Sequence, residues 1–318
     1  MVATAHTVAD AAPGAEPLPA VISVTGLRKR YGGQEAVAGV DLRIGAGEVF
    51  AILGPNGAGK TTTVEILEGY RRRDGGSVSV LGTDPAAPTR EWRGRIGIVL
   101  QSCRLPDELT VSELVEMYAG YYPRPRSVAE TIELVGLGGA GATRAGRLSG
   151  GQQRRLDVAL ALIGDPELIF LDEPTTGFDP AARRQAWEVV RGLARLGKTV
   201  LLTTHYLEEA EALADRVAVI VGGRIVAEGP PRSLAGRDRA PSRITVELGA
   251  AAAATLPAEL LQAAEQRDGV VSIRAQDPAD ALHALIHWSL EHGVRLEGLE
   301  VRRPSLEDTY LELLGGPS

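Results

Sequence analysis

Cysteine and lysine are scarce in this chain of 318 residues. Cys103 is the only cysteine, which excludes an intrachain disulfide and a cysteine-based zinc site and suits a reducing compartment. Lysine occurs only at positions 29, 60 and 198 among 34 basic residues, whereas 41 residues are acidic, so the formal net charge is −7. A chain with this balance has no broad basic surface, and we expect no nucleic acid as its partner.

Long apolar runs are also missing. A membrane-spanning helix needs about 20 consecutive apolar residues, whereas the longest strictly apolar stretch here, residues 158–163, lies between two aspartates. Residues 1–20 contain Asp10 and Glu16 and no Lys, Arg or apolar stretch, which predicts a disordered tail rather than a signal peptide. The 44% of hydrophobic residues suffices for full cores, and the length favours two domains. We therefore expect a cytoplasmic protein.

Apolar, β-prone stretches recur along the first two thirds of the chain. Val49–Leu53 runs into a glycine-rich loop and then into a predicted helix over residues 61–68. A first strand is predicted at residues 21–24, followed by a basic turn over residues 27–33. Four more stretches have the continuous apolar character of strands buried in a parallel sheet, namely residues 96–100, 168–171, 199–203 and 217–221. This pattern predicts an α/β domain over residues 21–235.

Two regions depart from that pattern. Residues 102–155 are helical and loop-rich, punctuated by Pro106, Pro123 and Pro125, and predict an inserted helical subdomain. After a charged linker at residues 237–243, strands and helices alternate again. The strands are predicted at residues 244–248, 270–274 and 294–301, and the helices at residues 257–266, 278–291 and 305–314. We therefore expect a small C-terminal α/β domain over residues 240–318.

The glycine-rich loop after Val49–Leu53 fits the pattern G-x-x-x-x-G-K-[ST]. Glycines allow a loop to wrap closely around a phosphate, so that its amides and the following helix N-terminus point at the anion. Lys60, which we expect in an exposed loop, would hold the β- and γ-phosphates, and the Thr61 hydroxyl would bind Mg²⁺. The alternative, a chance match among 38 glycines, is disfavoured by the strand–loop–helix order. We expect the nucleotide to be surrounded by Gly54, Pro55, Asn56, Gly57, Ala58, Gly59, Lys60, Thr61 and Thr62.

Two carboxylates follow the predicted strand at residues 168–171. Ligands bind at the carboxyl ends of parallel strands, so Asp172 is placed to hold Mg²⁺ through water and Glu173 to polarise an attacking water. Acidic residues after a strand can instead cap a helix. The phosphate loop favours the first interpretation.

A third motif, Leu-Ser-Gly-Gly-Gln at residues 148–152, begins a helical stretch 20 residues before the acidic strand end. Free amides and the helix dipole converge at such a helix N-terminus, which makes a second anion site possible. A plain helix cap is the alternative, because Ser-Gly-Gly alone is a common turn. The candidate residues are Ser149, Gly150, Gly151 and Gln152.

Together these motifs resemble the ABC-type ATPases, the nucleotide-binding subunits of ABC transporters, over about residues 21–232. The resemblance implies a P-loop NTPase fold and an ATP- and Mg²⁺-dependent ATPase. It implies that Tyr31 stacks on adenine and that Gln101 touches Mg²⁺ and senses a membrane partner. It also makes residues 148–152 the family signature, Asp179 an aspartate at a dimer interface, and His205 the switch histidine at the γ-phosphate. Phe178 departs from the leucine that is usual in the family.

Each of these residues has a simpler alternative. Tyr31 could be a turn aromatic, Gln101 a strand-end cap, and His205 the cap of the acidic helix that follows. Cys103 is expected to serve packing only. His283, His287 and His292 lack the arrangement of a zinc site, so we expect no metal there.

The segment at residues 301–311 resembles the C-terminal part of the drug-export ATPases related to daunorubicin/doxorubicin resistance, and residues 203–210 point the same way. This resemblance implies an ABC-2 type exporter subunit on the cytoplasmic face of the membrane. It would power a separate permease for a drug-like or lipophilic compound, with the helical insert as docking surface, and would form a homodimer or heterodimer with ATP bound.

Two other functions are alternatives to transport. A non-transport ABC ATPase acting on nucleic acid or ribosomes would need a coiled-coil or zinc insertion, or a second cassette, and the sequence has neither. A C-terminal small-molecule sensor is a third possibility, without a motif of its own.

Overall fold

The computed structural model describes residues 20–100 and 105–315 of the chain. It divides into two compact units, Met1–Pro231 and Arg232–Ser318, and each is described by itself. The expected N-terminal tail, Gln101 and Cys103 lie outside the described residues. The first unit contains two sheets and the helices around them, and the second contains one sheet.

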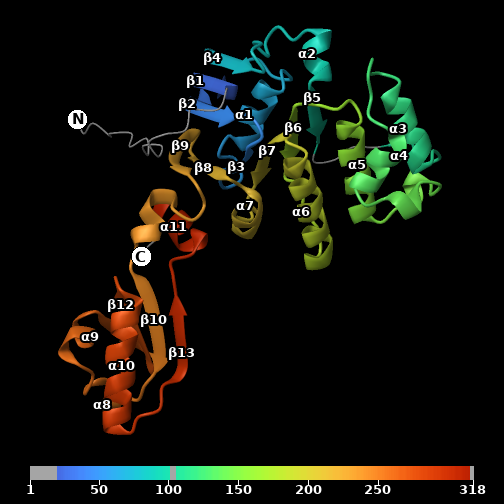
Figure 1. The fold of residues 1–318 in the computed structure, drawn as a ribbon. Helices are drawn as coiled ribbons and strands as arrows, with labels where there is room; N and C mark the ends of the chain where they lie inside the picture. The colour runs from blue at the N-terminus through green and yellow to red at the C-terminus, as the bar shows by residue number, and fades with distance from the viewer. Residues whose placement is uncertain (1–19, 101–104, 316–318) are drawn as a thin grey trace. The chain divides into compact units, whose positions relative to one another are not determined.

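A six-stranded sheet in the order β5-β6-β7-β3-β8-β9 forms the centre of the first unit (Figure 1). All neighbouring strands in it are parallel except β8 and β9, which form an antiparallel pair. Its central strands are almost wholly buried, as their uninterrupted apolar sequences predict. The strands are β3 (Val49–Leu53), β5 (Ile96–Val99), β6 (Leu168–Asp172), β7 (Thr199–Thr204), β8 (Arg216–Val221) and β9 (Arg224–Gly229).

A second, antiparallel sheet has the order β2-β1-β4, from β1 (Ala20–Tyr31), β2 (Gln34–Gly45) and β4 (Gly75–Val80). The basic turn expected at residues 27–33 is wrong, because β1 stays paired with β2 as far as Tyr31. The reversal is only Gly32-Gly33, both at positive φ, as a two-residue hairpin turn requires. Sequence reasoning also missed β2, β4 and β9.

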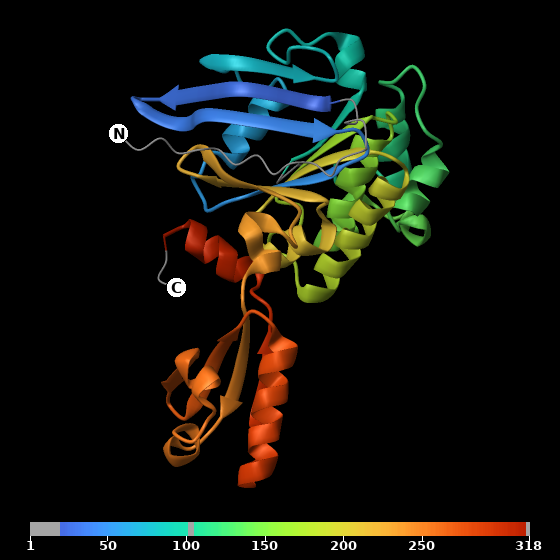
Figure 2. The ribbon, with the colours of Figure 1, turned by 60° about the vertical axis from the view of Figure 1, so that its left-hand side comes forward.

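Helices cover both faces of the six-stranded sheet (Figures 1 and 2). Helix α1 (Lys60–Leu67) shares one core with the antiparallel sheet, and its buried Val64, Ile66 and Leu67 belong to that core. On the other face lie α5 (Gly150–Leu162), α6 (Pro180–Arg195) and α7 (Leu207–Leu213), and α2 (Arg90–Gly94) contacts the edge strand β5. The helical insert adds α3 (Val111–Ala119), α4 (Val128–Leu134) and the short 3₁₀ turns η1 (Gly138–Ala140) and η2 (Ala145–Arg147).

The second unit is an antiparallel sheet, in the order β11-β12-β10-β13, packed on α10. Part of the helix expected at residues 257–266 is wrong, because residues 264–267 pair with β12 as an edge strand. The expected linker at residues 237–243 contains a 3₁₀ segment and the start of β10. The elements are η3 (Leu234–Arg239), β10 (Ser242–Glu247), α8 (Ala250–Ala253), α9 (Ala258–Gln262), β11 (Ala264–Arg267), β12 (Val270–Ala275), α10 (Pro278–His292), β13 (Glu297–Arg302) and α11 (Leu306–Leu313).

Candidate functional site

The phosphate loop joins β3 to α1, at the carboxyl edge of the parallel sheet. Two of its glycines are required by close backbone contacts. A Cβ on Gly54 would lie 2.4 Å from the carbonyl oxygen of Ile220, and one on Gly59 would lie 2.2 Å from that of Ala36. Gly59 also has φ +103°, a backbone conformation that would be strained in a residue with a larger side chain. The loop is therefore seated against the strands beneath it, and the first N–H groups of α1 have no acceptor within the helix.

Lys60 is the first residue of α1 and is only 4% exposed, so the expectation of an exposed loop lysine is wrong. Its ammonium donates to the carbonyl oxygens of Gly54 (2.7 Å) and Pro55 (3.2 Å). It also lies 3.9 Å from Glu173 Oε1. Burial lowers the pKa of Lys60, and the charges of Glu173 and Asp172 partly oppose this. The Lys60 ammonium is therefore a desolvated hydrogen-bond donor that points across the phosphate loop.

Asp172 ends β6, which lies beside β7, and Glu173 follows directly. The Thr203 hydroxyl donates to Asp172 Oδ1, and the Glu173 amide donates to Thr203 Oγ1 at 3.0 Å. Neither carboxylate caps a helix in this structure, because the cap of the following helix α6 is Asp179. Glu173 has φ +43°, a left-handed conformation that a glutamate rarely adopts. Such strain concentrates at functional sites.

The Glu173 carboxylate lies between residues from three segments. Its Oε1 is 3.9 Å from Lys60 Nζ and 3.4 Å from His205 Nδ1, and its Oε2 accepts a hydrogen bond from Thr176 at 3.1 Å. Its side chain is 15% exposed, so solvent still reaches it. His205 directly follows β7 and does not cap the acidic helix, because the cap position of α7 is Tyr206.

A second carboxylate, Glu68, is half-buried at the end of α1. Burial raises its pKa to about 8, and the charges of Asp172 and Glu65 add to the rise. Sequence reasoning missed Glu68, because nothing in its local sequence shows that it turns toward Asp172. At neutral pH this group is mostly protonated, which keeps the excess negative charge beside Asp172 small.

The remaining predicted residues lie at helix and strand ends. Ser149 caps α5 in a capping box: its hydroxyl accepts from the Gln152 amide, and the Gln152 side chain accepts from the Ser149 amide. Asp179 caps α6 by accepting from the amides of Ala181 and Ala182, both at 2.8 Å. Both residues are therefore helix caps in this structure, which leaves a role at a dimer interface as a prediction.

Tyr31 ends β1 and is 41% exposed. Lys29 Nζ and Arg71 Cζ lie 5.5 Å and 5.3 Å from its ring centroid. The ring is thus flanked by two cations at the margin of the first unit. Gln101, expected to touch Mg²⁺, follows β5 and lies outside the described residues.

The geometry agrees with the comparisons to known proteins. Residues 37–176 match the family described as ABC transporter, and residues 242–305 match the ABC transporter domain-containing protein-like, C-terminal domain. The daunorubicin resistance ATP-binding protein DrrA2 of Streptomyces coeruleorubidus is 41% identical over 307 residues, which cover 91% of this chain and 93% of the relative. The chain belongs to the ABC transporter ATP-binding proteins. As an ABC ATPase, it is an enzyme of ATP hydrolysis that serves transport.

Other relatives and solved structures support this assignment of the ABC ATPase. The Nod factor export ATP-binding protein I of Ralstonia nicotianae is 38% identical, covering 95% of this chain and 96% of the relative. The ADP conformation of an ATP-binding cassette superposes with a TM-score of 0.60 at 27% identity, covering 67% of this chain and 91% of that chain. A dimeric post-hydrolysis cassette bound to ADP and Pi gives 0.58 at 25% identity, covering 66% and 98%. The nucleotide-binding cassette fold is thereby shown.

Two buried charged residues of the ABC ATPase escaped sequence reasoning. Arg154, 8% exposed, and Glu209, fully buried, contact the segment that carries Glu173. In the sequence they look like exposed helix residues, because each stands among other charged residues. Only the packing of α5 and α7 against the strand ends buries them.

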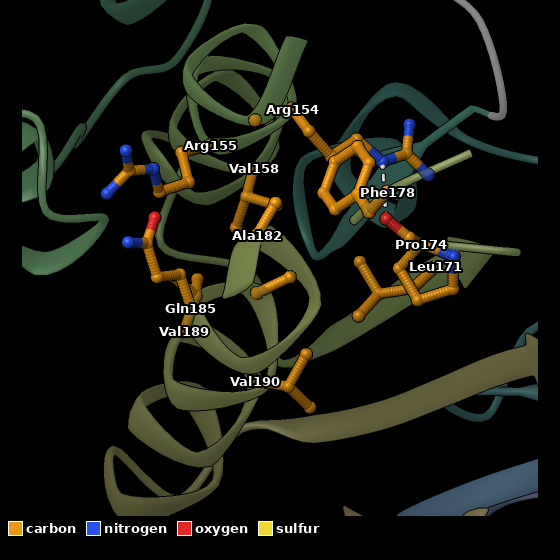
Figure 3. Close-up of a pocket in the computed structure, with 12 residues that line it drawn as sticks. Arg154, Arg155, Val158, Leu171, Pro174, Phe178, Ala182, Gln185, Val189 and Val190 are labelled. Atoms are coloured by element: carbon orange, nitrogen blue, oxygen red, sulfur yellow. Dashed lines mark hydrogen bonds between the residues drawn. The ribbon is translucent and has the colours of Figure 1, made fainter. Parts of the chain in front are cut away.

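A small cavity lies between α5 and α6 (Figure 3). Its volume of about 20 Å³ has room for roughly one water molecule. The lining is mostly apolar, and Val158, Leu171, Val189 and Val190 contribute to it. Phe178, which departs from the usual leucine, is also in its wall, so the departure changes packing between two helices.

The described residues of the ABC ATPase contain no helix long and apolar enough to cross a membrane. Within the same residues, no group of three or more His, Cys, Asp or Glu is arranged to hold a metal ion. His287 pairs with Glu291 at 3.3 Å on the exposed side of α10, and His292 contacts the Trp288 carbonyl.

Proposed function

We propose that this ABC ATPase hydrolyses MgATP with Glu173 as general base, and that hydrolysis powers export of a drug-like or lipophilic compound by a separate permease. One observation carries the catalytic part. Glu173 has Lys60 and His205 within 4 Å of one carboxylate oxygen, although the three residues come from different strand–helix junctions. A base, a phosphate-binding cation and a histidine therefore meet at the position where a γ-phosphate would lie.

The residues of the loop fit a nucleotide phosphate. The Lys60 ammonium donates to two loop carbonyls, and phosphate oxygens are stronger acceptors that would take over these hydrogen bonds. The amides of residues 54–62 and the start of α1 would bind the β- and γ-phosphates. Tyr31 would stack on adenine, a contact worth about 1–3 kcal/mol by analogy with base–aromatic platforms.

The oxygen atoms available at this site also fit Mg²⁺, which prefers hard oxygen ligands and keeps several waters. The Thr61 hydroxyl and the Asp172 carboxylate would hold it, with Gln101 as a further ligand. When bound, the ion neutralises charge on the phosphates. Thr203, by donating to Asp172, would orient that carboxylate.

In the reaction, Glu173 would accept the proton of the attacking water, a contribution typically worth 10²–10⁴-fold. His205 would orient the γ-phosphate and hold Glu173 through the contact at 3.4 Å. Lys60 would stabilise the charge that develops on the phosphate oxygens.

The site would be completed by the signature of a second copy. Ser149, Gly150, Gly151 and Gln152 begin α5, where free amides and the helix dipole favour an anion. One chain has one phosphate loop and one signature, and a solved relative of the fold is a cassette dimer with ADP and Pi. We infer an ATP-bound dimer in which Asp179 lies near the interface.

The transport part rests on relatives named for daunorubicin resistance and for Nod factor export. The second name indicates export of a compound and the first resistance to one, so we infer a membrane permease as partner and the cytoplasmic face of the membrane as location. The helical insert would be the docking surface. With both proteins co-expressed, crosslinks from residues 105–149 should reach cytoplasmic loops of the permease. Crosslinks confined to residues 240–318 would contradict this docking.

The catalytic proposal is tested with Glu173→Gln, which keeps the shape of the side chain but cannot accept the proton. We expect MgATP binding to persist and phosphate release to fall at least about 10²-fold. Glu208→Gln is the matched control, since that carboxylate is 81% exposed. Phosphate release at the parental rate in Glu173→Gln would show that the base lies elsewhere.

The dimer is tested in the Glu173→Gln background, where ATP persists. Light scattering should report a larger species with MgATP than without nucleotide. Adding Ser149→Arg places a bulky cation among the signature amides, and should abolish that increase while ATP binding to the Lys60 loop is retained. Equal ATP-dependent dimerisation with and without Ser149→Arg would refute the shared site.

A further inference from the structure

Two buried side chains of opposite charge contact residues 172–175, the segment that carries Glu173. Arg154 comes from α5, the helix that begins with the signature, and Glu209 comes from α7, which starts two residues after His205. Neither belongs to the phosphate loop or to the residues assigned above to nucleotide or Mg²⁺. They nevertheless link the segment that carries the base to α5 and α7.

Arg154 donates its hydrogen bonds to backbone oxygens, and it also lies 3.8 Å from the Asp157 carboxylate on the same helix. Its guanidinium donates to the carbonyls of Asp172 (2.9 Å) and Pro174 (3.3 Å), and to that of Leu100 at the end of β5 (Figure 3 shows the bond to Pro174). The carbonyls before and after Glu173 are therefore held by one side chain. Because Leu100 precedes Gln101, the same guanidinium joins this segment to the end of β5.

Glu209 contacts side chains. Its Oε1 accepts from the Thr175 hydroxyl at 2.8 Å and from Trp187 Nε1 at 3.1 Å. Thr175 is itself 1% exposed and stands two residues after Glu173, and Trp187 lies on α6, the helix that Asp179 caps. One carboxylate oxygen thus joins α7, α6 and the segment after β6.

The second carboxylate oxygen of Glu209 makes the burial of this side chain unfavourable for the stability of the fold. Oε2 is buried and has no hydrogen-bond partner among the residues that the structure describes. An unsatisfied buried acceptor destabilises the folded state, and more so when it is charged, so packing alone would favour an apolar residue here. A buried carboxylate in such a place points to a role other than stability.

The backbone conformation of Glu173 gives a reason for burying these two charges. Its backbone is left-handed at φ +43°, and a strained conformation persists only where its surroundings over-determine it. Arg154 holds the carbonyls on both sides of Glu173, and Glu209 holds the side chain of Thr175. Without these contacts the segment would relax and move Glu173 away from His205.

We propose that Arg154 and Glu209 form a clamp of positioning residues that holds Glu173 in place, with Glu209 setting the distance between Glu173 and His205. The clamp deepens the proposed function and rests on Glu173 being the base. Misplacing a reacting group by about 1 Å can cost about 10²-fold in rate, so breaking the clamp should lower kcat and leave nucleotide binding intact.

The first test compares Glu209→Leu with Glu209→Gln in the purified full-length chain. Leu removes both hydrogen bonds, whereas the amide oxygen of Gln can accept from Thr175 and from Trp187. We expect kcat for ATP to fall about 10- to 100-fold in Glu209→Leu, with KM and the affinity for a fluorescent ATP analogue unchanged. Glu209→Gln should restore most of the parental kcat.

A merely structural role would give a different result. Loss of folded protein lowers the number of nucleotide sites, and kcat per titrated site then stays parental. Parental kcat per site in Glu209→Leu would overturn the clamp, and so would an equal loss in the Leu and Gln variants. A rise in KM without a change in kcat would also overturn it.

Thr175→Val provides a second test that keeps Glu209 and avoids a large change in the core. It removes the hydroxyl that donates to Oε1, so kcat should fall as in Glu209→Leu, and Thr175→Ser should restore it. In the double variant, Glu209→Leu with Thr175→Val, the losses should not multiply, because both changes break one contact. Multiplying losses, or parental kcat in Thr175→Val, would overturn the clamp.

The clamp and the catalytic assignment fail in different ways. If Glu173→Gln hydrolyses ATP at the parental rate, the base is misassigned and the clamp falls with it. If Glu173→Gln is inactive but Glu209→Leu and Thr175→Val keep the parental kcat, only the clamp is wrong.

Discussion

The two units of this ABC ATPase differ in whether they bury charged side chains. In the first unit, Lys60, Arg154 and Glu209 are each less than a tenth exposed and contact the segment around Glu173 or its neighbours. In the described part of the second unit, the buried polar residues are Ser242, Ser289 and Thr309, and none of them is charged. Desolvated charges are costly, so their concentration in one unit marks where chemistry is performed.

The causes of the pKa shifts also differ between the two units. In the first unit, burial lowers the pKa of Lys60 and raises that of Glu68 to about 8. In the second unit, the pKa of Asp308 is lowered because its carboxylate accepts from the Ser305 amide in a capping box. The pKa of Arg302 is raised by its hydrogen bond to Glu300 on the surface. Burial perturbs these groups near the site, whereas local capping and pairing perturb the charged groups of the second unit, where burial raises the pKa of Tyr310.

The largest effect is expected for Lys60→Ala. Removing the ammonium deprives the developing phosphate charge of its donor, so kcat/KM for ATP should fall at least about 10²-fold. The matched control is Lys198→Ala, since Lys198 pairs with Asp165 in the same unit, away from the loop. Phosphate release and circular dichroism measured together separate lost chemistry from lost fold. Equal rates in the two variants would show that the lysine of the phosphate loop matters no more than a lysine outside it.

Leu285→Ala tests the second unit as a packing unit. Leu285 is fully buried in the core between α10 and its sheet, so its truncation should cost about 2–5 kcal/mol of unfolding free energy in that unit. ATP hydrolysis should stay unchanged, because no residue of the second unit is assigned to the site. Urea unfolding with parallel phosphate-release measurements checks both. A large loss of hydrolysis in a folded chain would give the second unit a regulatory role.

Glu68→Gln tests the pH dependence of the first unit. The folded-state pKa of Glu68, about 8, lies above its ordinary value of 4.5, so the folded state binds more protons between these values. Stability therefore falls as pH rises through this window, by up to about 1.4 kcal/mol per pH unit. Glu68→Gln should flatten that fall and be more stable than the parent at pH 8. Urea unfolding from pH 5 to pH 9 in EDTA checks it, and an unchanged pH slope would refute the assignment.

The smallest effect is expected for His287→Ala. His287 is 67% exposed and contacts Glu291 and the ring of His283 on the surface of α10, so the unfolding free energy should change by less than about 0.5 kcal/mol. Zn²⁺ should not raise the melting temperature of the parent. A zinc-dependent increase that His287→Ala abolishes would reveal a metal site in the second unit.

Much of the fold was predictable because local patterns agree with it. The expected buried strands at residues 49–53, 168–171 and 199–203 are confirmed as β3, β6 and β7, since uninterrupted apolar runs suit a sheet covered on both faces. Gly54 and Gly59 were predictable from the motif alone. The edge strands β4 and β11 were missed, because their polar, glycine-rich or mixed sequences carry little periodicity.

The sequence by itself determined the identity and order of the motifs, because each is a short run whose chemistry depends on neighbours in the chain. Only the tertiary structure decided which residues meet. The pairing of β6 with β7 brings Asp172 to Thr203 across 31 positions, and the packing of α7 brings Glu209 to Thr175 across 34. Burial is a property of the assembled layers: the same glutamate is a solvated helix residue in the sequence and a fully desolvated hydrogen-bond acceptor in the fold.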